Sequence, residues 1–225
     1  MHVIARIHND FPTKFGLPRQ SGLVEEVRST IVFEPAYRVP EALRGLEGYS
    51  HVWLVWQFHQ AEREEWSPTV RPPRLGGNVR MGVFATRSPF RPNPIGLSCV
   101  RLEEIRQDSR LGCVLVVSGA DLMDGTPIYD IKPYLPYVDC HPEATGGFAH
   151  EVKDRALEVR IPPELLERVP ADRQEALRGV LRQDPRPGYQ RDPDRRYGFT
   201  FAGMEVRFRV AEDVLTVTDI LPTKE

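Results

Sequence analysis

The sequence lacks long apolar runs and has little cysteine. Nowhere among the 225 residues do eighteen consecutive apolar residues occur, which excludes a predicted membrane-spanning helix. The first residues, MHVIARIHND, lack a cationic start followed by an apolar stretch, so we predict no signal peptide. The three cysteines, Cys99, Cys113 and Cys140, are widely spaced and typical of a reducing compartment. We therefore expect a cytoplasmic protein that does not associate with membranes.

Common nucleotide and metal motifs are missing too. No G-x-G-x-x-G follows a predicted strand and no G-x-x-x-x-G-K-[ST] occurs, so neither a Rossmann dinucleotide site nor a P-loop is indicated. The six histidines are scattered without an H-x-x-x-H pair, and we predict no metal site. A G-x-S-x-G nucleophile motif is also missing. These absences exclude the most common nucleotide-dependent and metal-dependent enzyme classes.

What is present in the first two-thirds is a series of short β segments. Five segments rich in β-branched and aromatic residues are predicted strands, at 2–9, 29–34, 50–58, 95–105 and 112–122. Between them, only 39–49 has the composition of a short helix. Because parallel strands need long crossover connections, this order favours an antiparallel sheet or barrel.

The composition changes near 141–152, and we place a domain boundary around 146–150. Beyond it we predict a strand at 155–161, helices at 162–169 and 171–183, and closing strands at 199–210, as a hairpin, and 214–221. The predicted domains are a β-rich unit, 1–147, and a small α+β unit, 148–225.

Charge is distributed unevenly along the β-rich unit. No acidic residue occurs from 66 to 102, a stretch that contains six arginines: Arg71, Arg74, Arg80, Arg87, Arg91 and Arg101. Within it, ATRSPFRPNPIGLS (85–98) has three prolines, which stiffen the backbone and present the arginines before a ligand arrives. Arginine suits bidentate capture of carboxylate or phosphate. We predict an anion-binding face here; a solvated basic surface is the alternative.

An acidic stretch follows the basic one. Residues 121–143 contain Asp121, Asp124, Asp130, Asp139 and Glu143 against a single Lys132, and we expect a loop there. A basic loop and an acidic loop at the ends of successive strands would together hold a ligand that carries both charges. The residues alone thus predict a β-rich protein that binds a nucleotide-like or nucleic-acid ligand.

Two long motifs carry a family resemblance. ATRSPFRPNPIGLS and DGTPIYDIKPYLPYVD (124–139) resemble the TrmO family, tRNA methyltransferases that act on N6-threonylcarbamoyladenosine at position 37. KFGLPRQSGLV (14–24), QDPRPGYQ (183–190) and RRYGF (195–199) extend the resemblance through nearly the whole chain. The sequence departs from the family at Phe90, often His, and Gly188, often Ala, so no acid or base is assigned to position 90.

The resemblance implies a mainly β fold: an antiparallel β-barrel domain that binds S-adenosylmethionine, a small C-terminal α+β domain, and a homodimer. It places cofactor contacts at Pro18, Arg19, Gln20, Phe58, His59, Arg87, Leu97, Asp121, Leu122, Met123 and Asp124. Arginines would meet the cofactor's carboxylate and aspartates its ammonium or ribose hydroxyls, while Phe58 would face the adenine or the sulfonium. The general base stays unassigned among Asp121, Asp130, His59 and Tyr129.

The partner implied is the anticodon loop of tRNA. The stretch 182–209 has seven arginines against four acidic residues, and for tRNA contact we favour Arg186, Tyr189, Arg195 and Arg196. Tyr197 and Phe199 suit base stacking and the core of a closing strand equally well. The alternative functions are a non-catalytic RNA-binding or regulatory module, and a methyltransferase of the same fold with another acceptor.

Overall fold

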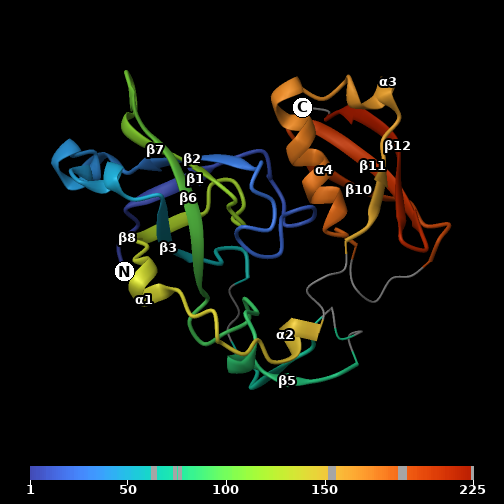
Figure 1. Ribbon diagram of the computed structural model, residues 1–225, viewed down its shortest axis with the longest axis horizontal. Helices are drawn as coiled ribbons and strands as arrows, with labels where there is room; N and C mark the ends of the chain where they lie inside the picture. Colours follow the sequence, from blue (N-terminus) through green and yellow to red (C-terminus); the bar gives the residue numbers. More distant parts are fainter. Residues whose placement is uncertain (62–64, 73–74, 76–77, 152–155, 187–191, 224–225) are drawn as a thin grey trace.

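The computed structural model describes residues 1–61, 65–72, 75, 78–151, 156–186 and 192–223, and these are mainly β (Figure 1). The prediction of a mainly β protein is confirmed. No helix among the described residues is long and apolar enough to cross a bilayer. In the same residues, no group of three or more His, Cys, Asp and Glu side chains is placed to hold a metal ion.

The first sheet closes on itself. Six strands pair in the order β1 (Ala5–His8), β2 (Arg28–Phe33), β7 (Gly112–Ser118), β6 (Ile95–Asp108), β3 (His51–Gln57) and β8 (Pro127–Pro133). β8 then pairs with β1 through Ala5 and Ile128, so the strands form a ring in which every pairing is antiparallel. Side chains that alternate along these strands fill the ring with an apolar core, including Ile7, Leu54 and Leu115.

One strand of the ring was not expected. We predicted a loop over 121–143, and this is wrong for β8. Pro127 and Pro133 are the first and last residues of the strand, where the missing N–H costs least. Between them Ile128 is fully buried in the core of the ring.

Short elements connect these strands. The segment 39–49, predicted as one short helix, forms two short 3-10 helices, η2 (Pro40–Leu43) and η3 (Leu46–Gly48), and a third, η1 (Pro35–Tyr37), precedes it. Elsewhere lie the two-stranded pair β4 (Thr69–Val70) and β5 (Met81–Gly82), the turn η5 (Val83–Ala85), and the one-turn helices α1 (Pro136–Asp139) and α2 (Phe148–Glu151).

The C-terminal residues form a second unit with its own core. A four-stranded sheet has the order β10 (Tyr197–Phe201), β11 (Met204–Ala211), β12 (Val214–Pro222) and β9 (Glu158–Arg160). The β10–β11 hairpin is predicted correctly, and the β9–β12 pairing is parallel. The helical part consists of α3 (Pro163–Leu166), η6 (Ala171–Arg173) and α4 (Gln174–Arg182). The apolar side chains of α4 are buried in this second core.

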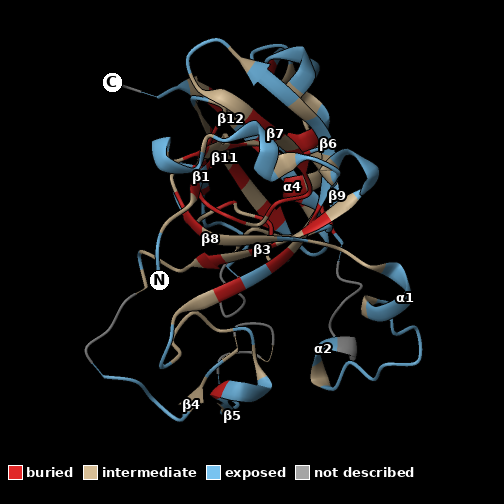
Figure 2. Cartoon of the chain, turned by 90° about the vertical axis from the view of Figure 1, so that its left-hand side faces the viewer, coloured by how far each residue is buried: buried red, intermediate tan, exposed pale blue. Residues whose placement is uncertain are grey.

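The N-terminal segment 9–27 joins the two units. It leaves the ring after β1, yet its apolar residues Phe11, Val24 and Val27 are buried in the core of the second unit, and Figure 2 shows the buried residues of both cores. Asp10 forms an ion pair with Arg173, 2.6 Å between Oδ2 and Nε. The segment contains Pro18, Arg19 and Gln20, so the second unit helps to position residues that the resemblance assigns to the cofactor.

Gly16 offers a test of this junction. Its φ of +90° is left-handed, and a Cβ there would lie 2.2 Å from the buried ring of Phe199. We expect Gly16→Ala to lower the free energy of unfolding by about 2–4 kcal/mol, because backbone strain adds to overpacking. Gly22, with φ +78° and nothing within 4 Å of its Cβ position, is the matched control. Urea unfolding should show a smaller decrease in the free energy of unfolding for Gly22→Ala than for Gly16→Ala. Equal decreases would show that the contact with Phe199 contributes nothing.

Candidate active site

A buried hydrogen-bond chain leads to Asp121, which follows β7. The indole Nε1 of Trp56 donates to Ser98 Oγ at 2.9 Å, and Ser98 Oγ lies 2.5 Å from Asp121 Oδ1. Ser98 is only 1% exposed. Because its oxygen accepts from Trp56, its hydroxyl proton is available to donate to the carboxylate. The chain therefore fixes one oxygen of Asp121.

Burial raises the pKa of Asp121. Four features oppose the rise by stabilising the carboxylate: the hydrogen bond from Ser98, the backbone N–H groups of Asp121 itself and of Ser21, and the positive charge of Arg87. A carboxyl group whose pKa lies above its ordinary value is suited to exchange protons near neutral pH.

Gln20 and Arg87 stand beside this carboxylate. Arg87 Nη1 donates to Gln20 Oε1 at 2.5 Å. Gly22 N donates to Gly119 O at 2.8 Å, so the N-terminal segment runs alongside the residues that precede Asp121. Three segments distant in sequence thus come together, and Arg87 of the basic stretch is close enough for its charge to act on the pKa of Asp121 in the acidic stretch.

The second arginine of the proline-rich loop has a different role. Arg91 Nη1 donates to the carbonyl oxygens of Val83, at 3.1 Å, and Thr86, at 2.6 Å. Its guanidinium lies 5.7 Å from the centre of the Phe84 ring. The expectation that both arginines are presented to a ligand is wrong for Arg91, because it folds back onto the carbonyls of its own loop.

An aromatic pair lies at the same end of β3. The ring centroids of Trp56 and Phe58 are 4.2 Å apart. The backbone N–H of Phe58 donates to Pro94 O at 2.8 Å, and this bond ties Phe58 to the end of the proline-rich loop. Gly96 pairs with Trp56 across β3 and β6, and a Cβ there would lie 2.2 Å from the indole. Glycine therefore lets the indole lie directly over β6. Leu97, next along β6, is exposed.

The remaining predicted cofactor residues have other surroundings. Leu122 and Met123 are buried, so they offer a ligand mainly backbone. Asp124 is exposed and accepts from Asn9 N at 3.1 Å, with His8 Nδ1 at 3.2 Å. His59 is half-buried and Pro18 buried. Gln20, Phe58, Arg87 and Asp121 are the predicted residues that these contacts bring together.

Arg19 contacts the second unit. Its Nη2 donates to the carbonyl oxygens of Asp184, at 2.7 Å, and Arg186, at 2.9 Å. This guanidinium therefore ties the segment that carries Gln20 to the end of α4.

Two of the other general-base candidates are engaged elsewhere. Asp130 Oδ2 pairs with Lys132 Nζ at 2.8 Å, and the Tyr129 hydroxyl donates to the side-chain oxygen of Gln57. Asp121 is the candidate that combines burial, a raised pKa and a fixed hydrogen-bond donor.

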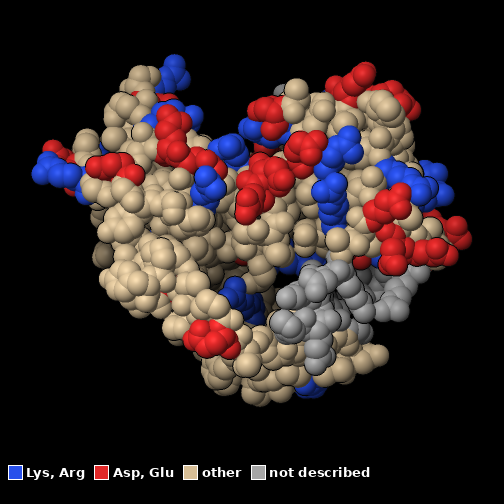
Figure 3. All heavy atoms as spheres, viewed as in Figure 1, with Lys and Arg blue, Asp and Glu red and all other residues tan. Residues whose placement is uncertain are grey.

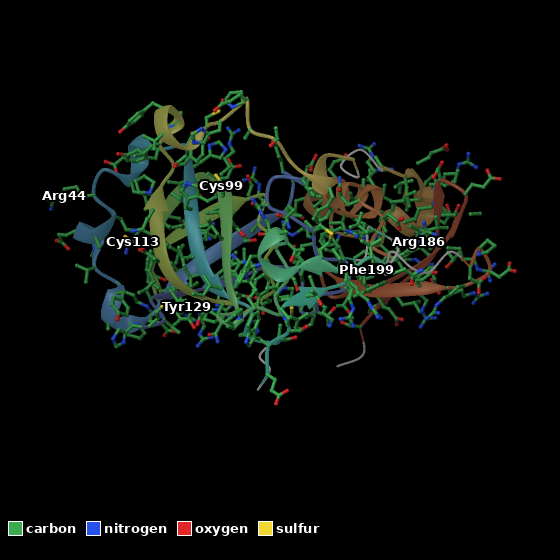
Figure 4. All side chains as sticks on the ribbon, turned by 90° about the horizontal axis from the view of Figure 1, so that it is seen from below. Arg44, Cys99, Cys113, Tyr129, Arg186 and Phe199 are labelled. Carbon is green, nitrogen blue, oxygen red and sulfur yellow. The ribbon has the colours of Figure 1, made fainter. Side chains whose placement is uncertain are left out.

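The predicted tRNA contacts differ in how accessible they are. Arg186 forms a bidentate pair with Asp184: its Nε donates to Oδ1 at 2.8 Å and its Nη2 to Oδ2 at 2.9 Å. Its side chain is only 12% exposed. Arg195 and Arg196 are exposed, and Tyr189 lies outside the described residues. Tyr197 and Phe199 are buried core residues, which settles that alternative; Figure 4 shows Phe199 and Arg186 in the second unit.

Trp56 and Ser98 are site residues that sequence reasoning missed. Both belong to predicted strands, where they look like ordinary core positions. Only the β3–β6 register, which pairs Trp56 with Gly96, reveals that Ser98 lies next along the same face of β6. Figure 3 shows this side of the molecule hollowed between the ring and the part of the chain that carries β5, with basic side-chain atoms inside the hollow.

Comparison with known proteins agrees with this geometry. Residues 6–140 match the tRNA-methyltransferase O N-terminal domain, and residues 154–223 match the TrmO C-terminal domain. The tRNA (adenine(37)-N6)-methyltransferase of Escherichia coli K12 is 42% identical over 219 residues, covering 93% of this chain and 92% of that protein. A Pseudomonas aeruginosa protein with the provisional name S-adenosylmethionine-dependent methyltransferase is 42% identical over 227 residues, 96% of this chain and 95% of its own.

A solved structure gives the same result. The crystal structure of TrmO from Pseudomonas aeruginosa superimposes with a TM-score of 0.79 at 35% identity, over 99% of this chain and 98% of that one. Both family models, the relatives and the fold agree over nearly the full length. The chain belongs to the TrmO family of tRNA methyltransferases.

Proposed function

We propose that the protein transfers a methyl group from S-adenosylmethionine to N6 of threonylcarbamoyladenosine at position 37 of tRNA. The family match over both units and the E. coli relative, named for methylation at N6 of adenine 37, support the reaction. The observation that carries the proposal is the Trp56–Ser98–Asp121 chain beside Arg87.

The residues present suit the methyl donor. S-adenosylmethionine carries a carboxylate, an ammonium, a sulfonium and an adenine. Arg87 would meet the carboxylate, and Asp124 the ammonium or a ribose hydroxyl. Phe58, which is partly exposed and packs against the buried Trp56 with 4.2 Å between the ring centroids, offers an aromatic face for the adenine or the sulfonium. Pro18, Leu97 and the backbone of Leu122 and Met123 would complete the contacts that the resemblance implies.

The chain's chemical task is to align the reactants and to remove one proton. The cofactor supplies a methyl group on sulfur that is already activated, so positioning lowers most of the barrier. The acceptor N6 is bonded to a carbonyl carbon and to the purine, and while protonated it is a poor nucleophile. We propose that Asp121 takes this proton, because Ser98 orients its carboxylate and its pKa is raised.

Further proposals concern the whole molecule. We propose that the closed ring is the cofactor-binding barrel, that residues 1–147 and 148–225 are separate domains, and that the second contacts tRNA. Arg195 and Arg196 are exposed for phosphate contact, and Tyr189 is proposed from its sequence position. Arg186 is the weaker candidate, because it is paired with Asp184. By the same resemblance the active form is a cytoplasmic homodimer.

The reaction is tested by mass spectrometry of nucleosides. Purified protein is incubated with S-adenosylmethionine and tRNA that bears the threonylcarbamoyl group, and the tRNA is then digested. A methyl increment on that nucleoside is expected, and none when the tRNA lacks the modification. Cofactor binding without methylation would disprove the acceptor, and loss of both would disprove the site.

A further inference from the structure

A short arm projects from the ring and belongs to neither apolar core cluster. We define the arm as the described residues 65–72 and 78–84, in which β4 and β5 pair through Thr69–Gly82 and Val70–Met81. Figure 2 shows β4 and β5 at the bottom, away from the strands of the ring. Its exposed side chains are therefore positioned to meet a partner, whereas Val83 is buried.

The arm carries two exposed aromatic side chains. Trp66 is 52% exposed and Phe84 72% exposed. Their ring centroids are 6.2 Å apart with an angle of 31° between the planes, so the two rings form one small apolar surface. A contiguous exposed aromatic surface of this kind is typical of a binding site.

The charge around these rings is mainly positive, and Glu65, which precedes Trp66, is the one acidic residue among the described residues of the arm. Arg71 and Arg80 are exposed on the arm, and the Arg91 guanidinium lies 5.7 Å from the centre of the Phe84 ring. No acidic residue occurs in the sequence from 66 to 102. Aromatic faces interleaved with arginines are the combination that binds unpaired nucleotides, since bases stack on the rings and phosphates meet the guanidinium groups.

We propose that Trp66 and Phe84 form a stacking platform for unpaired bases of the tRNA anticodon loop, with Arg71 and Arg80 beside its phosphates. This rests on the proposed function and adds the surface that holds the loop. A second copy of the chain fits less well, because a self-complementary contact would bring Arg71 and Arg80 of one arm against those of the other, and Glu65 is the one carboxylate among the described residues of the arm.

The experiment measures Trp66 directly. The other two tryptophans, Trp53 and Trp56, belong to β3, so the emission difference between the native protein and Trp66→Phe isolates Trp66. An anticodon stem-loop RNA should quench this difference signal. Phe84→Ala should raise the tRNA Kd and KM at least about fivefold, the loss expected for one stacked base, with the Kd for S-adenosylmethionine unchanged.

The matched control is Tyr137→Ala. Tyr137 is 85% exposed but lies in α1, where Asp139 and nearby Glu143 are acidic, and its removal should leave the tRNA Kd unchanged. If the native protein methylates tRNA and Phe84→Ala leaves the tRNA Kd and KM unchanged, the stacking platform is disproved and the proposed function stands. A change from dimer to monomer by light scattering with the same tRNA Kd would assign the arm to a contact between copies. Native protein that methylates no tRNA would instead disprove the proposed function.

Discussion

Asp121→Asn is expected to reduce the single-turnover rate of methyl transfer by about 10²- to 10⁴-fold, the range for loss of a general base. Asparagine keeps the size of the side chain and an oxygen that accepts from Ser98, but it cannot take a proton. Because burial raises the pKa of Asp121, the ionised side chain is unfavourable in the folded protein, and the variant should unfold at no lower temperature. Rate loss without stability loss would mark a catalytic role.

The control replaces a carboxylate outside the site. Asp108 is the last residue of β6 and accepts from the backbone of Arg110 and Leu111, at 2.8 and 2.9 Å. Asp108→Asn should leave the transfer rate unchanged. An Asp121→Asn variant that keeps more than about a tenth of the native rate would contradict the assignment of the base.

Ser98→Ala gives the same assignment a pH signature. A general base works when ionised, so the rate should rise with pH and level off above the pKa of Asp121. The hydrogen bond from Ser98 lowers that pKa against the effect of burial, so removing it should raise the pKa further. The acidic limb of the rate profile should move to higher pH in Ser98→Ala; no movement, or movement to lower pH, would contradict the proton-transfer role.

Local pattern was enough to predict most of the fold. Alternation in 50–58 and 112–122 predicted β3 and β7, and the missing crossover helices predicted antiparallel pairing. The prediction failed at β8, which contains Asp130 and Lys132, because the charged stretch 121–143 was taken as a loop. A proline at either end of a strand removes no hydrogen bond that the sheet needs. Whether a proline falls at the end of a strand depends on how that strand pairs with its neighbours, and the sequence of one strand does not reveal this.

The site was predictable where function depends on residue type. Opposite charges in successive segments predicted that a basic and an acidic stretch would face the same ligand, and the positive charge of Arg87 does act on the pKa of Asp121. Side chains that bind backbone carbonyls were not predictable, because every residue has a carbonyl and sequence does not mark which ones are close. Arg91, bound to the carbonyls of Val83 and Thr86, is one example, and Arg19 is the other.

Arg19→Ala should weaken both the junction and the cofactor site. Arg19 donates to two carbonyls of the second unit, while the adjacent Gln20 and Ser21 contact Arg87 and Asp121. Loss of hydrogen bonds from a charged group is expected to lower the free energy of unfolding by about 2 kcal/mol. If the whole of this free energy is needed to hold Gln20 in place for the cofactor, its loss should raise the Kd for S-adenosylmethionine by up to about 30-fold. Urea unfolding and calorimetric titration of the cofactor measure the two effects.

Arg168 provides the control that separates positioning from general destabilisation. Its Nη1 donates to Ile220 O at 2.9 Å, a guanidinium–carbonyl bond made entirely within the second unit. Arg168→Ala should lower the free energy of unfolding by about as much as Arg19→Ala and leave the Kd for the cofactor unchanged. If Arg19→Ala weakens cofactor binding with no loss of stability, Arg19 contacts the cofactor directly, as the family resemblance implies. If both quantities change together in Arg19→Ala alone, the second unit acts on the methyl-transfer site through this guanidinium.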